Sequence, residues 1–372
     1  MRAVTVRPND PDSLEVRDVP EPEPADGELL VDGLAVGVCG TDKEIVAGDY
    51  GGAPPGSERL VIGHESLGRV RRAPRGSGFS AGDLVVGVVR RPDPEPCPAC
   101  AHGEFDMCRN GDYTERGIKE RHGYASQVWT VEHDYAVKLD PGLDRVGVLM
   151  EPTTVVAKAW EQVERVGARA WFDPRRVLVT GAGPIGLLAA LLGAERGLDV
   201  HVLDQVDSGP KPALVGDLGA KYHSDGIERA VESVRPDIII EATGASHIVF
   251  EAIAGTAAFG VVCLTGVSPK GRRISVDAGA LNRELVLEND AVVGSVNANL
   301  RHYRQAADAL ARADRGWLER MITRRVPLER AAEAFTAQDD DIKVVITLND
   351  HDHDHDQDHE NRNENENDHE HA

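Results

Sequence analysis

Residues 175–204 read RRVLVTGAGPIGLLAALLGAERGLDVHVLD, and this stretch decides the fold. An apolar strand leads directly into the run GAGPIG at 181–186, which opens an apolar helix and is followed by a second strand. In that context Gly181 permits a tight turn, Gly183 lets the backbone approach a pyrophosphate, and Gly186 lets helix and sheet pack closely. The helix N-terminus attracts phosphates. The stretch predicts a dinucleotide-binding unit; the alternative is a glycine-rich turn with a purely structural purpose.

The end of the second strand carries an acidic residue, Asp204, which lies 18 residues beyond Gly186. A carboxylate at this position can accept hydrogen bonds from the ribose hydroxyls, and it repels the 2′-phosphate of NADP. No Arg follows it immediately, since the next residues are Gln205, Val206 and Asp207. The sequence therefore predicts NAD or NADP as coenzyme, with a preference for NAD.

Working outward, the apolar runs DIIIEATG (237–244) and VVCLTGV (261–267) alternate with helical stretches. Such alternation predicts an α/β domain with a doubly wound parallel sheet, which we place at residues 156–290. Residues 1–155 contain short apolar runs between Gly, Pro and Asp clusters and predict a β-rich domain. Residues 291–348 are mixed again, with a helix expected in VPLERAAEAFTA (326–337) and a final strand in IKVVITL (342–348). Residues 349–372, rich in Asp, His and Asn, predict a disordered tail.

The bulk composition limits the partners. The chain has 372 residues and a net charge of −22. An acidic protein is a poor partner for nucleic acid, and no apolar run approaches the ~18 to 20 residues that span a bilayer. The first residues contain no export signal, so we expect a cytoplasmic protein. Only eight of the 41 basic residues are Lys. That surface suits a high-salt cytoplasm, although a GC-rich genome would also favour Arg over Lys.

Five cysteines, an odd number without an export signal, favour metal ligation over disulfides. Cys97, Cys100 and Cys108 lie at short spacing and predict a structural zinc site that lacks an evident fourth ligand. The alternative is a loop of free thiols. Cys263 lies in an apolar run and is expected in the core. The candidates for the fourth ligand are Asp93, Glu95, His102, Glu104 and Asp106.

A second set of ligand-type residues is dispersed along the chain. Cys39 lies in VGVCGTD (36–42), His64 and Glu65 in GHES (63–66), and Glu151 in LMEPTTVV (149–156). One thiolate, one imidazole and one carboxylate suit a catalytic zinc site that leaves a position open for water or substrate. Nothing in their spacing brings them together, and each alone has an ordinary structural explanation.

The order of these motifs resembles the zinc-containing medium-chain dehydrogenase/reductase family over residues 1–348. It matches CGTD, GHE, a Cys-rich lobe, GxGxxG and an EATG strand end. The Glu-Pro pair at 151–152 is similar to the polyol and glucose dehydrogenase branch. DYTERGIKERHGY (112–124), LMEPTTVVAKA (149–159) and GSVNANL (294–300) resemble archaeal glucose 1-dehydrogenases, particularly halophilic ones. The resemblance implies a GroES-like β-barrel catalytic domain joined to a Rossmann domain.

The resemblance also implies roles for residues. Cys39, His64 and Glu151 would hold the catalytic zinc, with Glu65 alternating as ligand or neighbour, and Thr41 would pass on the substrate proton. The expected sugar contacts are Thr41, Glu115, Glu151 and Asn297. The expected coenzyme contacts are Gly181, Gly183, Pro184, Ile185, Gly186, Asp204, Gln205, Thr265, Gly266, Val267, Ser295, Val296 and Asn297.

Two departures from the family pattern stand out. Pro94 falls where the first of four lobe cysteines would stand, so the lobe is one thiolate short. Lys43 and Glu44 fall where a relay His often follows CGTD.

The predicted activity is zinc-dependent, NAD(P)-linked oxidation of the anomeric hydroxyl of D-glucose to gluconolactone. One alternative is a polyol or other aldose dehydrogenase of the same branch. Another is a non-catalytic dinucleotide- or metal-binding protein that uses its His-rich tail. The family commonly associates through the nucleotide-binding domain, so we expect a homodimer or homotetramer.

Overall fold

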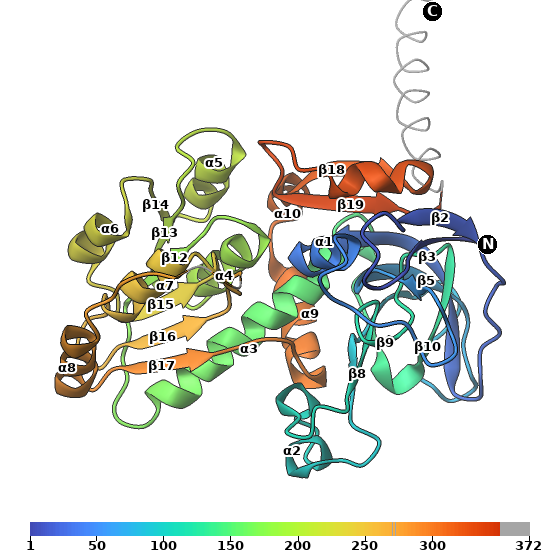
Figure 1. Ribbon diagram of the computed structural model, residues 1–372, viewed down its shortest axis with the longest axis horizontal. Helices are drawn as coiled ribbons and strands as arrows, with labels where there is room; N and C mark the ends of the chain where they lie inside the picture. The colour runs from blue at the N-terminus through green and yellow to red at the C-terminus, as the bar shows by residue number, and fades with distance from the viewer. Residues whose placement is uncertain (270, 272, 350–372) are drawn as a thin grey trace, which may run out of the picture.

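The computed structural model describes residues 1–269, 271 and 273–349 (Figure 1). Its nucleotide-binding domain holds a six-stranded parallel sheet in the order β14-β13-β12-β15-β16-β17. In chain order this is the doubly wound 3-2-1-4-5-6 arrangement, with its switch point between β12 and β15. The predicted doubly wound parallel sheet is confirmed. Its strands are β12 Arg176–Thr180, β13 Asp199–Leu203, β14 Lys221–His223, β15 Ile238–Glu241, β16 Val261–Leu264 and β17 Ala291–Gly294.

Helices cover both faces of this sheet. They are α4 Pro184–Glu195, α5 Pro210–Asp217, α6 Ile227–Val234, α7 Ser246–Ile253 and α8 Ala278–Glu288. The four expected strands correspond to β12, β13, β15 and β16, while β14 and β17 lacked a sequence signal. Those two are short edge strands, and their residues are half-buried or exposed, so they carry no continuous apolar run.

The glycine-rich turn has the geometry that its sequence predicts. Gly181 adopts a left-handed backbone conformation with φ of +93°. Gly183 is the residue before α4 and has open space where a Cβ would stand. A Cβ on Gly186 would collide with the carbonyl oxygen of Gly181, so only glycine lets the helix begin this close to the strand.

The catalytic domain is built mainly from antiparallel strands around a long central strand, β3 (Glu28–Val38), although β18 pairs with β19 and β8 with β9 in parallel. It pairs with β5, β10 and β19, and the sheet continues through β6, β11 and β18. A second sheet has the order β2-β1-β4 and a third β7-β8-β9. The strands are β1 Arg2–Val6, β2 Glu15–Asp18, β4 Leu60–Val61, β5 Glu65–Arg72, β6 Leu84–Gly87, β7 Arg90–Arg91, β8 Thr114–Arg116, β9 Glu120–Arg121, β10 Val128–Glu132, β11 Ala136–Lys138, β18 Ile322–Pro327 and β19 Lys343–Thr347.

Short helices connect these strands. They are α1 Gly40–Val46, α2 Pro98–Ala101, η1 Phe105–Met107, η2 His133–Tyr135, η3 Pro141–Leu143, η4 Gly147–Leu149 and η5 Leu328–Phe335. The helix expected over 326–337 is wrong at its start. Val326 and Pro327 end strand β18, because they are drawn into its ladder with β19, and only 328–335 is helical, as a 3-10 helix.

Three helices lie where the two domains meet. α3 (Met150–Gly167) runs from the catalytic domain to the nucleotide-binding sheet, and α9 (Leu300–Arg312) and α10 (Arg315–Met321) lead back to the catalytic sheet (Figure 1). One buried core cluster extends through both domains and includes Leu67, Trp160 and Val179. The chain then pairs β19 with β3, so that Val344 lies opposite Val38.

The expected domain boundaries stay predictions, and the one at 155/156 falls inside α3. The expected disordered tail lies outside the described residues except for Asn349, whose side chain donates to the Gly33 carbonyl at 2.6 Å. No helix among the described residues combines the length and apolar character that crossing a bilayer requires.

The glycine turn generates a stability prediction. Gly186→Ala should lower the free energy of unfolding by about 1–3 kcal/mol, because the new methyl group meets the Gly181 carbonyl. Gly216→Ala is the matched control, since Gly216 is also helical and has nothing within 4 Å of an added Cβ. The control should stabilise by roughly 0.5–1 kcal/mol. Urea unfolding of both variants checks this, and equal effects would contradict the proposed close approach.

Candidate active site

The site begins where β3 ends and α1 starts. Cys39 occupies the position before α1, and the Asp42 carboxylate accepts the backbone N–H of Cys39 at 3.0 Å. The other oxygen of Asp42 lies 3.3 Å from His64 Nδ1. This buried carboxylate therefore orients both residues, and it directs His64 Nε2 toward the Cys39 thiol. A carboxylate on the outer nitrogen of a histidine is the usual support for a metal ligand.

The predicted ligands come together with one exception. Cys39 Sγ lies 3.1 Å from His64 Nε2, and the ligand atoms of Cys39, His64 and Glu65 lie within 4.8 Å of one another. Glu151, in the first turn of α3, is outside that group. Its charge nevertheless interacts with those of His64 and Glu65.

Glu65 is tied to a cation from the far end of the chain. Lys343, on β19, donates to Glu65 Oε1 at 2.5 Å and to the Val38 carbonyl at 3.2 Å, and both side chains of the ion pair are almost completely buried. A Cβ at Gly37 would collide with the Glu65 carboxylate. Glycine at this position on β3 therefore makes room for the acid.

Burial and neighbouring charges shift the titration of these groups. Burial raises the pKa of the Glu151 carboxyl to about 7, and the Glu65 charge adds to that rise, while His64 and Lys343 oppose it. Burial alone would lower the pKa of His64, but attraction to Cys39 and Asp42 raises it well above its ordinary value. Burial also raises the pKa of the Cys39 thiol. Each of these groups would release its proton more readily beside a divalent cation.

The donor set fits zinc. A thiolate, an imidazole supported by a carboxylate, and two nearby carboxyl groups match the ligand chemistry of a catalytic zinc centre, which uses few protein ligands. Asp42, His64 and Glu65 are buried, and the acidic groups lie beside the Lys343 ammonium, so a divalent cation would further relieve the crowding of negative charge.

The cysteine-rich lobe forms a second group. Cys97, Cys100 and Cys108 place their sulfur atoms within 4.8 Å of one another. Hydrogen bonds from the backbone N–H of Arg109 and of Cys100 lower the pKa of Cys97 to about 6, which favours the thiolate that a metal requires.

The structure narrows the choice of fourth ligand. Asp106 is paired with Lys158, Glu104 with Arg165, and His102 lies with Nδ1 2.7 Å from the Pro98 carbonyl. Asp93 is buried, and its Oδ2 has no hydrogen-bond partner among the described residues. Asp93 and Glu95 therefore remain the carboxylates without an ion-pair partner in that set, and the lobe zinc stays a prediction.

Two of the four residues expected to contact the sugar, Glu115 and Asn297, are in direct contact. Asn297 Nδ2 donates to Glu115 Oε1 at 2.6 Å, and Arg90 donates to the same oxygen through Nε at 3.1 Å and Nη2 at 2.9 Å. Asn297 adopts a left-handed backbone conformation with φ of +61°. Thr41 is half-buried in the first turn of α1, next to Asp42.

The residues expected to contact the coenzyme lie along one edge of the nucleotide-binding sheet. Each group follows the carboxyl end of a strand, which is where ligands bind in doubly wound sheets. Val267 and Val296 are strongly exposed there, with 79% and 61% of their surface accessible. The groups are Gly181, Gly183, Pro184, Ile185 and Gly186 after β12, Asp204 and Gln205 after β13, Thr265, Gly266 and Val267 after β16, and Ser295, Val296 and Asn297 after β17.

Asp204 is more constrained than its sequence position suggested. Its carboxylate accepts the N–H of Ala182 at 2.7 Å and that of Val206 at 3.1 Å. Lys211, in the first turn of α5, donates to it at 3.1 Å. The acid is thus partly neutralised by a lysine that sequence reasoning overlooked.

Three functional neighbours escaped the sequence analysis: Asp42, Lys343 and Lys211. Asp42 had a local signal, because an acid three residues after Cys39 fits the capping pattern of a helix start. The other two lay beyond the motifs considered.

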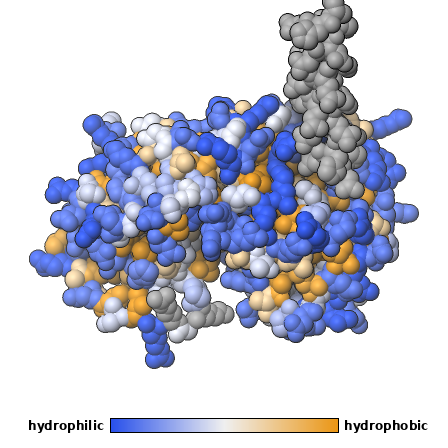
Figure 2. All heavy atoms as spheres, turned by 90° about the horizontal axis from the view of Figure 1, so that it is seen from above, coloured by the Kyte–Doolittle hydropathy of each residue, from blue (hydrophilic) through white to orange (hydrophobic). Residues whose placement is uncertain are grey.

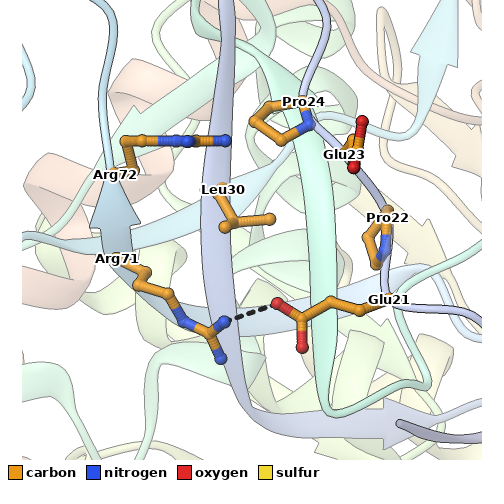
Figure 3. Close-up of a pocket in the computed structure, with 7 residues that line it drawn as sticks. All are labelled: Glu21, Pro22, Glu23, Pro24, Leu30, Arg71 and Arg72. Carbon is orange, nitrogen blue, oxygen red and sulfur yellow. Dashed lines mark hydrogen bonds and ion pairs between the residues drawn. The ribbon is translucent and has the colours of Figure 1, made fainter.

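Two surface features bear on where a ligand could enter. The space-filling view shows a notch at one edge of the molecule, between the nucleotide-binding domain on the left and the catalytic domain on the right (Figure 2). A separate cavity of about 520 Å³ lies beside β3 and β5, where Arg71 pairs with Glu21 at 2.6 Å (Figure 3). None of the predicted ligands lines that cavity, so it is not part of the site.

Family profiles and sequence relatives both match this chain to dehydrogenases. A family profile described as the glucose dehydrogenase C-terminus matches residues 144–348, and one described as the alcohol dehydrogenase GroES-like domain matches residues 25–141. The glucose 1-dehydrogenases of Methanocella arvoryzae and Thermoproteus tenax are each 43% identical, over 94% and 93% of this chain and 99% of their own length.

A solved structure extends the comparison. Haloferax mediterranei glucose dehydrogenase, in complex with NADP, zinc and gluconolactone, has a TM-score of 0.86 and 34% identity, over 94% of this chain and 99% of that one. These matches confirm the predicted combination of a GroES-like domain with a Rossmann domain.

Proposed function

Because the chain belongs to the zinc-containing medium-chain dehydrogenase family, in its glucose 1-dehydrogenase branch, we propose that it oxidises the anomeric hydroxyl of D-glucose to gluconolactone with zinc and NAD(P). The observation that carries this function is the convergence of Cys39, from the CGTD motif, with His64 and Glu65, from the GHES motif. The relatives from Haloferax and Halobacterium agree with the halophilic composition.

The reaction removes a hydride from C1 of the sugar and a proton from its hydroxyl, and the hydride reduces the nicotinamide. Cys39, His64 and a carboxylate from Glu151 or Glu65 would hold the zinc, which would supply the Lewis acidity that lowers the pKa of the hydroxyl. Thr41, two residues after Cys39 in the first turn of α1, would pass the released proton outward. Lys43 and Glu44, both exposed on α1, stand in place of a relay histidine.

Glu115 and Asn297 orient the sugar. Among the described residues, Arg90 and Asn297 donate hydrogen bonds to Oε1 of the Glu115 carboxylate. Its Oε2 is therefore left to accept a hydrogen bond from a sugar hydroxyl. The Arg90 guanidinium forms an ion pair with this buried carboxylate at 2.9 Å. Several polar groups in one pocket suit a polyhydroxylated substrate better than a simple alcohol.

Removing the thiolate tests the function. Cys39→Ala should abolish zinc retention at the cluster and lower kcat/KM for glucose by roughly 10³-fold, because several kcal/mol of transition-state stabilisation is lost. Cys263→Ala is the matched control, since that thiol is buried in β16 away from the cluster, and it should keep the activity within a few-fold.

The same assay separates the alternatives within the branch. Initial rates with glucose, galactose, xylose and sorbitol at molar salt should favour glucose. Full glucose oxidation by Cys39→Ala would refute the zinc mechanism, and a preference for sorbitol would reassign the substrate to polyols.

The coenzyme preference depends on Lys211. We propose that its ammonium group, 3.1 Å from Asp204, offsets the charge of the acid and donates hydrogen bonds to the 2′-phosphate of NADP, so that both coenzymes are used. The predicted preference for NAD rested on Asp204 without this lysine.

Lys211→Met should raise KM for NADP about tenfold, the effect of one charge-assisted hydrogen bond, and leave KM for NAD within a few-fold. Lys221→Met is the control, because Lys221 pairs with Asp199 at the opposite end of β13. The proposal fails if KM for NADP in Lys211→Met equals that of the wild type.

We also propose self-association through the free edge of the nucleotide-binding sheet. β17 is the last strand in the sheet order, and Val292 on it is exposed, as are Val286 and Leu287 on the adjacent α8. An exposed apolar edge strand pairs readily with a second copy about a two-fold axis. A homodimer or a homotetramer built from such dimers would bury it.

Leu287→Asp should convert the assembly to monomers in sedimentation equilibrium, because it places a charge in the proposed interface. Ala213→Asp adds the same charge to exposed surface on α5, beside the opposite edge of the sheet, and should leave the mass unchanged. A monomeric wild-type protein would contradict the interface.

The cytoplasmic location stays a prediction, in keeping with five free thiols.

A further inference from the structure

A buried ion pair joins the cysteine-rich lobe to α3. Lys158 Nζ lies 2.8 Å from Asp106 Oδ2, and only 1% and 2% of the two side chains are exposed. Asp106 belongs to η1, between Cys100 and Cys108, and Lys158 lies in the middle of α3. The proposed reaction gives neither residue a task.

Both members of the pair also bind the loop 295–299, which follows β17. Lys158 Nζ donates to the Val296 carbonyl at 2.8 Å, and Asn299 Nδ2 donates to Asp106 Oδ1 at 2.7 Å. Asn299 in turn caps the start of α9, since its Oδ1 accepts the Arg301 N–H at 3.0 Å. The loop is therefore fixed on both sides of Asn297.

The lobe also reaches the other sugar-contacting residue. Arg90 Nη1 donates to the Asp106 carbonyl at 3.1 Å, while the rest of the same guanidinium binds Glu115. Asp106 is thus connected to Glu115 through Arg90 and to the loop of Asn297 through Lys158 and Asn299. Glu115 and Asn297 meet between these two connections.

Stability alone does not explain such a pair. Two buried charges lose their hydration, and well-packed apolar residues of similar size often stabilise a protein equally well or better. An apolar pair could not hold the Val296 carbonyl or the Asn299 amide. We propose that Asp106 and Lys158 are positioning residues, which anchor loop 295–299 to the lobe and so place Asn297 beside the sugar and Val296 beside the nicotinamide.

This inference rests on the proposed function for its kinetic consequence, and an apolar replacement tests it. The double variant Asp106→Leu/Lys158→Met removes both charges at similar volume, so it should stay folded, with a lower thermal midpoint because the Val296 carbonyl and the Asn299 amide lose their partners. Its KM for glucose should rise and its kcat fall, with kcat/KM lower by roughly 10- to 100-fold. The reason is that Asn297 and Val296 would no longer hold the sugar and the nicotinamide in the orientation that the reaction requires. Zinc content at the Cys39 cluster should not change.

A control and a second readout distinguish the possible failures. Asp199→Asn/Lys221→Met removes an ion pair of the same charge from an exposed site and should alter none of these values. Hydrogen exchange should accelerate about tenfold in residues 294–300 of the apolar double variant and stay unchanged in β12, because two anchors of the loop are lost.

Exchange in 294–300 equal to that of the wild type would overturn the positioning role, whatever the activity. A folded double variant with wild-type kcat/KM would overturn it as well. A wild-type protein that does not oxidise glucose would instead refute the proposed function, and the exchange measurement would still decide whether the pair anchors the loop.

Discussion

The continuity of helix α3 is the constraint on which the rest of the site depends. Its 18 residues extend for about 27 Å. Glu151 lies in its first turn beside the metal cluster, Lys158 in its middle, and Trp160 packs on the nucleotide-binding domain with its indole N–H 3.3 Å from the Ala189 carbonyl. A single rigid helix therefore fixes the distance between a proposed zinc ligand and the sheet that binds the coenzyme. Glu161, also on α3, binds Arg301 and His302 and so holds α9 in place against the same helix.

The few lysines of this chain include two that are buried and that connect separate segments. Lys is scarce in this chain, yet Lys158 and Lys343 are both 1% exposed and lie at the functional centre. Each ammonium group binds a carboxylate and a backbone carbonyl at once. A compact point charge with three donors suits that task, whereas the wide planar fork of Arg suits paired recognition of one carboxylate. Arg90 illustrates the second case, because its Nε and Nη2 both bind Glu115. An acidic surface with few lysines is therefore compatible with lysines retained inside.

The sequence predicted those parts of the fold whose signals are local. The glycine turn, the four central strands of the parallel sheet and the two cysteine motifs each lie within a short window. The edge strands β14 and β17 were missed because their residues are half-exposed. Lys343 and Glu65 are 278 positions apart, and Asn297 and Glu115 are 182 apart. Such pairs leave no periodic pattern, and only the family resemblance had joined Cys39, His64 and Glu151. Lys211 was missed because it follows Asp204 by seven positions, outside the segment inspected for a basic residue.

Glu65 and Glu151, the two acids near the cluster, differ in their distance from Cys39 and His64 and in the charges around them. These differences bear on which of the two would bind a metal ion. Glu65 is closer to Cys39 and His64, but the Lys343 ammonium already neutralises it, so binding a cation would require that pair to loosen. Glu151 is farther away, and burial raises its pKa to about 7, so near neutral pH it gives up its proton to a divalent cation at little cost. Geometry thus favours Glu65 and electrostatics favours Glu151. We therefore propose that Glu151 binds the cation and that Glu65 stays paired with Lys343, so that neither buried carboxylate is left without a positive partner.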